Sequence, residues 1–388
     1  MLPRRQEQID RRYMRMACRL AEKAAGRTSP NPMVGAVLVR DGKMIASGFH
    51  QFAGGDHAEI VALKKAGNKA KGATLYINLE PCNHYGRTPP CTHSLIAGGV
   101  KEVVVGIKDP NPLVSGKGLR ALARAGIKVR NGVLYEECRT LNEAFTKFIT
   151  SGVPFVTLKL AASLDGKIAT ANGDARWISC EESRVTVHRL RNSYDAVLVG
   201  AGTVISDDPQ LTCRISGGRD PWRIILDARL RIPLHGEFLR QRGGNKNIIV
   251  TSDTAPAGKI SALENLGATV WRLPAREGAV RWLPLLKKLA KTGIASVLIE
   301  GGATTAAGAL KEKVVDKMLL FYAPKLLGGD GRYMIDSLGV EHVKQSVMLQ
   351  NLKIEKSGAD LLVSGYLKTS AAGGRAKLKG SPASCLPV

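Results

Sequence analysis

The chain has 388 residues, enough for two or three domains, and its 44% apolar and 23% charged residues are the balance of an ordinary globular protein. Its apolar stretches are all shorter than the about 18 residues of a membrane-spanning helix, and the basic N-terminal segment lacks the apolar core of a signal peptide. Seven cysteines, an odd number in a long chain, argue against a disulfide framework. We therefore expect a cytoplasmic protein.

The net charge of +24 is compatible with two classes of partner. A basic surface attracts nucleic acid, and it also attracts small anionic ligands such as phosphates. Only 5% of the residues are aromatic, and the sequence contains no recognition-helix or base-stacking motif. We therefore expect phosphorylated small molecules as ligands, and no nucleic-acid partner.

The first 150 residues alternate between helical and extended patterns. Apolar residues at helical spacing predict a helix over 10–26, which the breaker-rich segment 28–32 ends. Asp41 and Gly42 predict a tight hairpin turn between strands 34–39 and 44–48. The alternation indicates a layered α/β domain. Its other predicted elements are helix 57–66, strand 74–78, helix 91–98, strand 103–107, helix 116–125 and strand 127–129.

A short segment rich in helix breakers, residues 150–154, predicts a joint between two domains. We expect domains at residues 1–150 and 151–370. The small, polar and basic residues 371–388 cannot bury enough surface to fold, which predicts a disordered tail. The elements predicted after the joint are strand 155–161, helix 181–191, strands 196–199, 223–226, 247–250 and 296–299, helix 304–312 and strand 317–322.

The most specific chemical signal is His57 and Glu59, followed by Cys82 and Cys91. It matches the H-x-E…P-C…C pattern of zinc-dependent deaminases. A catalytic zinc takes three protein ligands and keeps one position for water, and one imidazole with two thiolates supplies them. Water bound to such a zinc loses its proton near neutral pH. Glu59, two residues beyond the histidine, can take that proton and deliver it to the departing amine.

Two other interpretations of these residues remain open. His57 and the cysteines could be ordinary packing residues. Alternatively, Cys82 and Cys91 could form a closed structural zinc site with His84 and His93, each of which follows a cysteine by two residues. That second interpretation leaves Glu59 without a role. The eight residues between the two cysteines also depart from the usual two, which makes the general motif less specific.

The same long spacing resembles a particular family. Residues 79–91, LEPCNHYGRTPPC, resemble the motif of the riboflavin-biosynthesis deaminases, as do SPNPMVGA at 29–36, GDHAE at 55–59 and KDPNP at 108–112. The resemblance implies a three-layer fold like that of cytidine deaminase, acting on a diaminopyrimidinone ribosylamine phosphate. It also implies a pocket lined by Asn31, His50, Asn83, His84 and Arg87. For Asn31 and Asn83, a role in turns is the alternative.

A glycine-rich segment at 116–121, GKGLRA, has the form of a dinucleotide-binding fingerprint. The fingerprint works only where the glycines directly follow a strand and open a helix onto a pyrophosphate. Here the segment 109–112 separates the glycines from the strand before them. We therefore interpret residues 116–121 as the start of an ordinary helix.

The second domain has a better nucleotide candidate. Strand 296–299 leads through Gly301 and Gly302 into a helix, and such a turn lets backbone N–H groups approach a phosphate. A plain connection between a strand and a helix is the alternative.

Resemblance adds to this picture. VTLKLAASLDGK at 156–167, RWIS at 176–179, VGAGT at 199–203, DDPQLT at 207–212 and IEGG at 299–302 resemble the pyrimidine reductase of the same pathway. That family is similar in fold to dihydrofolate reductase and uses NADPH. The resemblance implies cofactor contacts at Ala161, Trp177, Thr203, Asp207, Ala228, Gly302, Ala303, Thr304, Thr305, Ala306, Ala307 and Gly308. It implies substrate contacts at Ala175, Arg191, Leu211, Arg214 and Glu300.

A guanidinium fork suits a phosphate, so Arg191 and Arg214 make physical sense in a phosphate site, although each could be a solvated surface charge. Taken together, the zinc motif and the two resemblances imply a bifunctional enzyme that uses Zn²⁺ and NADPH. Its deaminase releases ammonia from a phosphorylated pyrimidine, and its reductase converts the ribosyl group to ribityl. The resemblance also implies a homo-oligomer. A family member with a single activity and a nucleic-acid deaminase are the alternatives.

Overall fold

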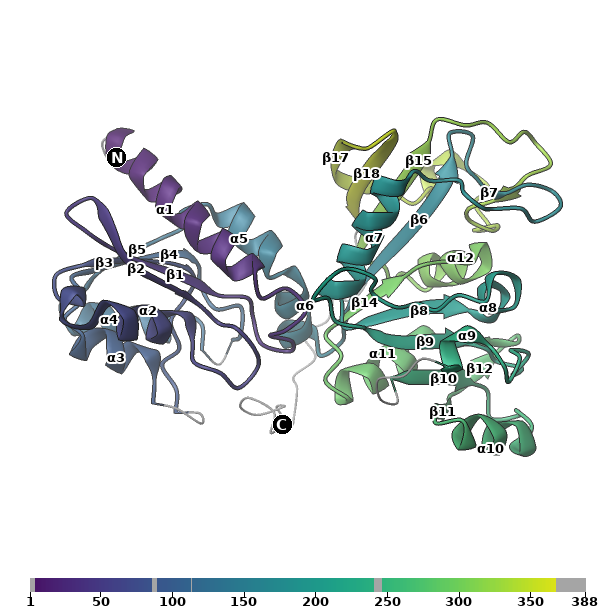
Figure 1. Cartoon of the computed structure of the whole chain (residues 1–388), viewed down its shortest axis with the longest axis horizontal. Coiled ribbons are helices and arrows are strands. Elements are labelled where there is room, and N and C mark those ends of the chain that lie inside the picture. The colour runs from purple at the N-terminus through teal and green to yellow at the C-terminus, as the bar shows by residue number, and fades with distance from the viewer. Residues whose placement is uncertain (1–3, 86–88, 113, 241–245, 368–388) are drawn as a thin grey trace. The chain divides into compact units, whose positions relative to one another are not determined.

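The computed structural model describes residues 4–85, 89–112, 114–240 and 246–367. The described chain divides between Gly152 and Val153 into two compact units, called here the first and the second unit (Figure 1). Thr150 and Ser151, which we expected in the joint, are the last residues of helix α6 (Glu143–Ser151). The predicted tail 371–388 lies outside the described residues.

The first unit is a five-stranded sheet between two layers of helices (Figure 1). In the strand order β2-β1-β3-β4-β5, β1 is antiparallel to both neighbours, and β3, β4 and β5 are parallel. The strands are β1 (Gly35–Arg40), β2 (Lys43–Phe49), β3 (Thr74–Leu79), β4 (Glu102–Ile107) and β5 (Lys128–Asn131). The helices are α1 (Arg4–Glu22), α2 (Ala58–Ala66), the 3₁₀ turn η1 (Gly67–Ala70), α3 (Cys91–Ala97), α4 (Lys117–Arg124), α5 (Tyr135–Leu141) and α6.

Each face of this sheet has its own apolar core. Leu38 and Leu75 pack toward α2, α3 and α4, while their neighbours Val37 and Tyr76 pack toward α1 and α5. This division follows from the strand geometry, in which successive side chains point to opposite faces. The predicted three-layer arrangement is confirmed.

Some element bounds differ from those expected. Helix α1 begins at Arg4, six residues before the predicted start, because its first turns are charged residues that form helix well without apolar periodicity. Helices α5 and α6 were not predicted. Between them Asn142, a buried residue, accepts a hydrogen bond from the Met33 N–H (2.8 Å) and donates one to the Met33 carbonyl (3.0 Å). Asn142 thereby fixes the loop before β1.

A buried polar network links α1 to the sheet. The Arg130 guanidinium on β5 donates to the Asp10 carboxylate and to Glu102, at 2.6 Å for the latter. Tyr76 and Gln6 also donate to Asp10, each at 2.9 Å. Asp10 is only 1% exposed, so its carboxylate is held by these four N–H and O–H donors and has little contact with solvent.

We expect Asp10→Asn to lower the free energy of unfolding by about 2 kcal/mol, because the amide directs N–H groups toward the Arg130 guanidinium. Burial opposes ionisation, but hydrogen bonds from Arg130, Gln6 and Tyr76 hold the pKa of Asp10 below its ordinary value. The contribution of the carboxylate is therefore complete above about pH 4 and is lost as the pH falls through the lowered pKa. Urea unfolding from pH 7 downwards measures both effects. The matched variant Asp41→Asn, at a carboxylate that is 90% exposed, should lose little stability; a loss as large as that of Asp10→Asn would contradict the prediction.

The second unit is built on a nine-stranded sheet in the order β11-β10-β9-β8-β14-β6-β15-β18-β17 (Figure 1). All neighbouring strands are parallel except β15-β18 and β18-β17. Its nine strands are β6 (Phe155–Ser163), β8 (Ala196–Gly200), β9 (Trp222–Leu226), β10 (Asn247–Thr251), β11 (Thr269–Arg272), β14 (Ser296–Ile299), β15 (Lys317–Ala323), β17 (Leu349–Ser357) and β18 (Asp360–Leu367). Two small separate sheets pair β7 (Lys167–Ala169) with β16 (Arg332–Tyr333) and β12 (Ala275–Arg276) with β13 (Ala279–Val280).

Helices cover both faces of this sheet. On one face Trp282, Leu286 and Leu310 of α11 and α12 form a core with the strands, and on the other Val204 and Leu263 of α8 and α10 do so. The strands and helices predicted up to β15 are all present, but helices α8, α9, α10 and α11 and strands β7, β11, β12 and β13, which lie among them, were not predicted. The hairpin β17–β18 was not predicted, because most of β17 is exposed and has no regular apolar alternation. The helices are α7 (Glu181–Ser193), α8 (Ala201–Asp207), α9 (Glu237–Arg240), α10 (Ala257–Asn265), α11 (Trp282–Lys291), α12 (Ala303–Lys311) and the 3₁₀ turn η2 (Val343–Gln345).

Within the described residues, no helix is long and apolar enough to cross a membrane.

Candidate functional site

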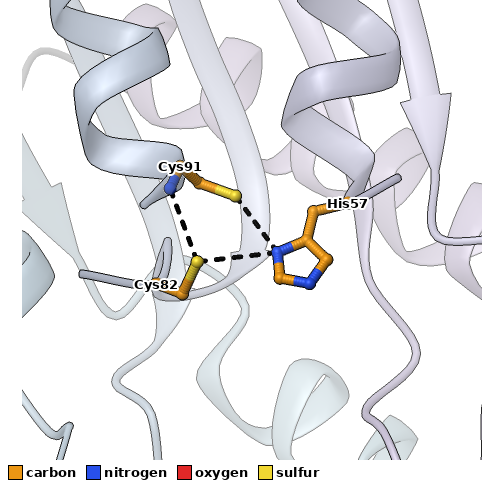
Figure 2. Close-up of side chains that lie close together, drawn as sticks. All are labelled: His57, Cys82 and Cys91. Atoms are coloured by element: carbon orange, nitrogen blue, oxygen red, sulfur yellow. Dashed lines mark hydrogen bonds between the residues drawn. The ribbon is translucent and has the colours of Figure 1, made fainter. Parts of the chain in front are cut away.

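In the first unit, three predicted ligands converge from separate elements (Figure 2). His57 is the residue that caps the start of α2, Cys82 lies in the loop after β3, and Cys91 is the first residue of α3. Their ligand atoms all lie within 4.8 Å of one another. The His57 Nδ1 is 3.1 Å from the Cys91 sulfur and 3.6 Å from the Cys82 sulfur.

The electrostatics of this cluster favour a cation. Hydrogen bonding from the Cys91 thiol, with help from His57, lowers the pKa of Cys82 well below its ordinary value, which favours the thiolate form of its sulfur. The backbone N–H of Cys91 also donates to that sulfur, at 3.4 Å. One imidazole and two sulfurs at these distances match the donor set of a three-ligand zinc site.

Two buried polar atoms beside the cluster have no hydrogen-bond partner among the described residues. They are Oε2 of Glu59, a side chain that is 2% exposed, and Nε2 of His50, which is 3% exposed. The His50 ring lies 5.4 Å from the His57 ring, and its Nδ1 contacts the Asp56 carbonyl at 3.1 Å. Burial raises the pKa of Glu59. A raised pKa suits a carboxyl that must both accept and release a proton. Unpaired buried atoms of this kind indicate a place for a ligand.

The geometry favours the open site over the closed one. The cluster of possible ligands in the described part of the chain contains His57, Cys82 and Cys91, and neither His84 nor His93 belongs to it. Both of these histidines are exposed, and the His93 ring packs edge-on against Tyr85. The residues present therefore fit a zinc ion with three protein ligands and Glu59 beside them.

The remaining predicted pocket residues are placed as follows. The backbone N–H of Asn31 donates to the Thr28 carbonyl at 2.7 Å, so this residue closes a turn before β1. The side-chain oxygen of Asn83 accepts a hydrogen bond from the Thr92 hydroxyl at 2.7 Å and so ties the Cys82 loop to α3. Arg87 lies outside the described residues.

In the second unit, predicted cofactor residues lie at the carboxyl ends of four neighbouring parallel strands. Ala161 is near the end of β6, Thr203 follows β8, Ala228 follows β9, and the Gly302 turn follows β14. These strands are adjacent in the order β9-β8-β14-β6. The carboxyl ends of parallel strands are where open α/β sheets bind ligands. Residues as far apart in the sequence as Ala161 and Gly302 thus share one edge of the sheet.

The turn after β14 has the backbone that its glycines predict. Gly301 has a φ of 147° and Gly302 a φ of 77°, and Gly302 precedes the first residue of α12. A Cβ on Gly302 would lie 3.4 Å from the hydroxyl oxygens of Thr203 and Thr305. The two glycines therefore form a tight turn that places backbone N–H groups at a helix start.

The predicted substrate residues Arg191 and Glu300 form a buried pair. The guanidinium donates from Nε and Nη2 to the two carboxylate oxygens of Glu300, at 2.7 and 2.9 Å. Burial opposes ionisation of Glu300, but Arg191 holds its pKa below the ordinary value. Arg191 is therefore no solvated surface charge. Leu211, another predicted contact, is buried with a φ of 57°.

Two residues near this pair were not identified from the sequence. His188 contacts Arg214 through both ring nitrogens, each at 3.3 Å, and burial lowers its pKa. Lys159 on β6 has a pKa lowered by burial, with the carboxylate of Glu300 near enough to oppose that shift. A charged residue within a mostly apolar strand was the sequence signal for Lys159.

Other predicted residues lie at the surface of the second unit. Trp177 is 62% exposed, with the Arg184 guanidinium 4.7 Å above its ring, and its carbonyl accepts a hydrogen bond from Lys325 at 2.7 Å. Asp207 ends α8, where its carbonyl accepts a hydrogen bond from Arg176 at 3.0 Å. Ala175 belongs to the segment between β7 and α7 that carries Trp177.

Comparison with known proteins places both halves in one family. Residues 7–107 match the cytidine and deoxycytidylate deaminase zinc-binding region, and residues 154–363 match the RibD C-terminal domain. The riboflavin biosynthesis protein RibD of Aquifex aeolicus is 45% identical, over 92% of this chain and 98% of its own. The chain belongs to the RibD family. The Escherichia coli RibD is 38% identical, over 91% of this chain and 98% of its own.

Solved RibD structures agree with this membership. Acinetobacter baumannii RibD superimposes with a TM-score of 0.83 at 38% identity, covering 94% of this chain and all of its own. A Thermotoga maritima structure, described as a diaminohydroxyphosphoribosylaminopyrimidine deaminase/5-amino-6-(5-phosphoribosylamino)uracil reductase, gives 0.81 at 38% identity, with the same coverage. The predicted pair of folds is confirmed. As a RibD enzyme, the chain combines a zinc-dependent deaminase with an NADPH-dependent reductase of riboflavin biosynthesis.

Proposed function

We propose that the deaminase acts on a diaminopyrimidinone ribosylamine phosphate and that the reductase converts the ribosyl group of its product to ribityl. The observation that carries this proposal is the convergence of His57, Cys82 and Cys91 beside Glu59, whose Oε2 has no hydrogen-bond partner among the described residues, in a chain whose other unit matches the RibD reductase. The Thermotoga maritima relative, described by these two activities, supports it.

In the deaminase, His57, Cys82 and Cys91 hold zinc, which when bound activates water as a Lewis acid. Glu59 takes a proton from the water and delivers it to the departing amine, which leaves as ammonia. His50 presents its unpaired Nε2 to the substrate. Asn31, Asn83, His84 and Arg87 complete the pocket.

In the reductase, the turn after β14 and the start of α12 bind the phosphates of NADPH, which supplies the hydride. The binding residues we propose are Ala161, Trp177, Thr203, Asp207, Ala228 and the seven residues 302–308. Arg191, Arg214, Glu300, Leu211 and Ala175 orient the ribosylamine phosphate. The Arg191 guanidinium donates to Glu300 from Nε and Nη2 and to the Thr212 carbonyl from Nη1 (3.0 Å), so the N–H groups that it has left for the substrate are held in a fixed direction.

The test is an assay of the purified full chain with the diaminopyrimidinone ribosylamine phosphate. Without NADPH we expect one ammonia per substrate and the deaminated ribosylamine; with NADPH we expect the ribitylamine as the final product. If the deaminated ribosylamine is the final product even with NADPH present, the chain is an enzyme with a single activity. Deamination of single-stranded DNA with comparable efficiency would instead favour a nucleic-acid deaminase.

We expect Gly302→Val to weaken NADPH binding about tenfold or more, because the positive φ suits glycine and strain there costs about 1–3 kcal/mol. Fluorescence titration of NADPH on the full chain measures the effect, and ammonia release should be unchanged. Gly293→Val is the matched control, since Gly293 has a φ of 82° and lies before β14, at the opposite end of the same strand. Wild-type NADPH affinity in Gly302→Val would show that the turn only connects β14 to α12 and does not bind the cofactor.

The proposal extends to partners and setting. The positive charge serves phosphorylated small molecules, and no nucleic-acid partner is required. A homo-oligomer is supported by β17, which ends the order of the described strands and exposes Leu352 and Ile354. A cytoplasmic location is supported by the free thiols Cys82 and Cys91, which a reducing compartment protects. We assign deamination to residues 1–150 and reduction to residues 151–370.

A further inference from the structure

The glycine-rich start of α4 binds an anion that the chain itself supplies. The carboxylate of Glu80 accepts hydrogen bonds from four backbone N–H groups, two to each oxygen. Oε2 accepts from Asp109 (3.1 Å) and Gly116 (2.9 Å), and Oε1 from Gly118 (2.9 Å) and Leu119 (3.2 Å). The N–H groups that a fingerprint helix would offer to a pyrophosphate are therefore already engaged.

Glu80 lies between β3 and the ligand Cys82 in the first unit. It directly follows the last residue of β3 and precedes Cys82 by two positions, and it is 4% exposed. Its oxygens reach the segment after β4 and the first turn of α4, more than 28 residues away along the chain. One side chain thus joins the loop that carries Cys82 to two other parts of the unit.

The same helix start also contacts the loop through its backbone. A Cβ on Gly118 would lie 2.2 Å from the carbonyl oxygen of Pro81, the residue before Cys82. Only glycine permits that approach, because any larger residue would displace the carbonyl. The two contacts, one with Glu80 and one with Pro81, fix two successive residues of the loop against α4.

We propose that Glu80 is a positioning residue for the metal ligand Cys82, an inference that rests on the proposed zinc ligands. Its carboxylate anchors the loop to the start of α4 and so sets the direction of the Cys82 sulfur toward His57 and Cys91. A carboxylate is required because both of its oxygens receive N–H donors. An amide would place its own N–H₂ against two of them, leaving those donors unpaired in a buried site.

The expected effect of Glu80→Gln is about a 10–100-fold weaker zinc affinity in the full-length enzyme, the size seen when residues that orient metal ligands are replaced. Zinc affinity is measured by competition with a chromophoric chelator. Cobalt(II) in place of zinc gives a second readout, since its visible and thiolate charge-transfer bands report the geometry at Cys82. We expect altered cobalt bands, and unchanged reduction of supplied deaminated intermediate.

Asp10→Asn is the matched control. Asp10 is a buried carboxylate of the same unit with four donors, but it lies in the α1 layer and its partners are Arg130, Tyr76 and Gln6. It should lose stability and keep zinc affinity and cobalt bands. Equal losses of zinc affinity in Glu80→Gln and Asp10→Asn would show that Glu80 acts only through the overall stability of the unit, and would overturn the proposal.

Gly118→Ala provides a second variant, since it keeps residue 80 a glutamate, while its Cβ would displace the Pro81 carbonyl and crowd the Glu80 carboxylate, 3.2 Å from Oε1. It should weaken zinc affinity as Glu80→Gln does, and it decides the matter if Glu80→Gln does not fold. If Glu80→Gln folds, wild-type zinc affinity and unchanged cobalt bands in that variant would overturn the proposal. If it does not fold, the same result in Gly118→Ala would overturn it. Full zinc occupancy in Cys82→Ala would instead show that the ligand assignment had failed.

Discussion

Glu59→Gln should reduce the rate of deamination by about 10²–10⁴-fold while zinc content stays at one per chain. The carboxyl is buried, its Oε2 has no partner among the described residues, and its pKa is raised by burial, so it can exchange a proton with water and the departing amine. The amide has nearly the same shape as the carboxyl, but it cannot take a proton from water and pass it to the amine. Ammonia release from the ribosylamine substrate and elemental analysis measure the two quantities.

Reduction is the internal control for this variant, because the reductase residues belong to the second unit. Supplied deaminated intermediate should be reduced by Glu59→Gln at the wild-type rate. Glu22→Gln, at an exposed carboxylate at the end of α1, should leave deamination unchanged. A near-native rate of deamination in Glu59→Gln would remove this residue from the mechanism.

Cys82→Ala and Cys91→Ala should each lose the bound zinc and with it all measurable deamination, because a site with three protein ligands does not survive the removal of one thiolate. Elemental analysis of the purified variants gives the zinc content directly. Cys18→Ala is the matched control. Cys18 is also a free cysteine of the first unit, and its sulfur lies 3.6 Å from that of Cys138, apart from the ligand cluster.

Histidine variants distinguish the two forms that a zinc site could take. His57→Ala should lose zinc, whereas His84→Ala and His93→Ala should retain it. The reverse pattern would establish the closed structural site and exclude a water position at the metal.

The sequence predicted many of the elements that bury a regular apolar face, although it missed helix α11, which buries Trp282, Leu285, Leu286 and Leu289. Strands such as β4 and helices such as α12 were found because their apolar residues recur at the spacing of the structure that they form. Helix α6 was missed because the described chain buries none of its side chains completely, which leaves the apolar periodicity faint. The start of α1 was missed for a similar reason, since Arg4, Arg5 and their neighbours are exposed.

The site was predictable only where chemistry restricts the residue type. Thiolates and an imidazole at family spacing identify a zinc site without any coordinates. The role of Glu80 was not predictable, because it depends on the start of α4, 36 to 39 residues later, lying against its carboxylate. His188 was missed because its position follows from how α7 packs beside the segment carrying Arg214.

Asn142 has a consequence for where this chain can be cut. The match to the deaminase family model ends at residue 107, and a fragment trimmed there would retain all three zinc ligands. It would lack the side chain that accepts a hydrogen bond from the Met33 N–H, so that N–H would lose its partner, and Asn78 alone would hold the Met33 carbonyl. Any exchange of deaminase modules between proteins must therefore carry the chain at least past residue 142. The transferable piece is longer by a third than the part that sequence similarity marks.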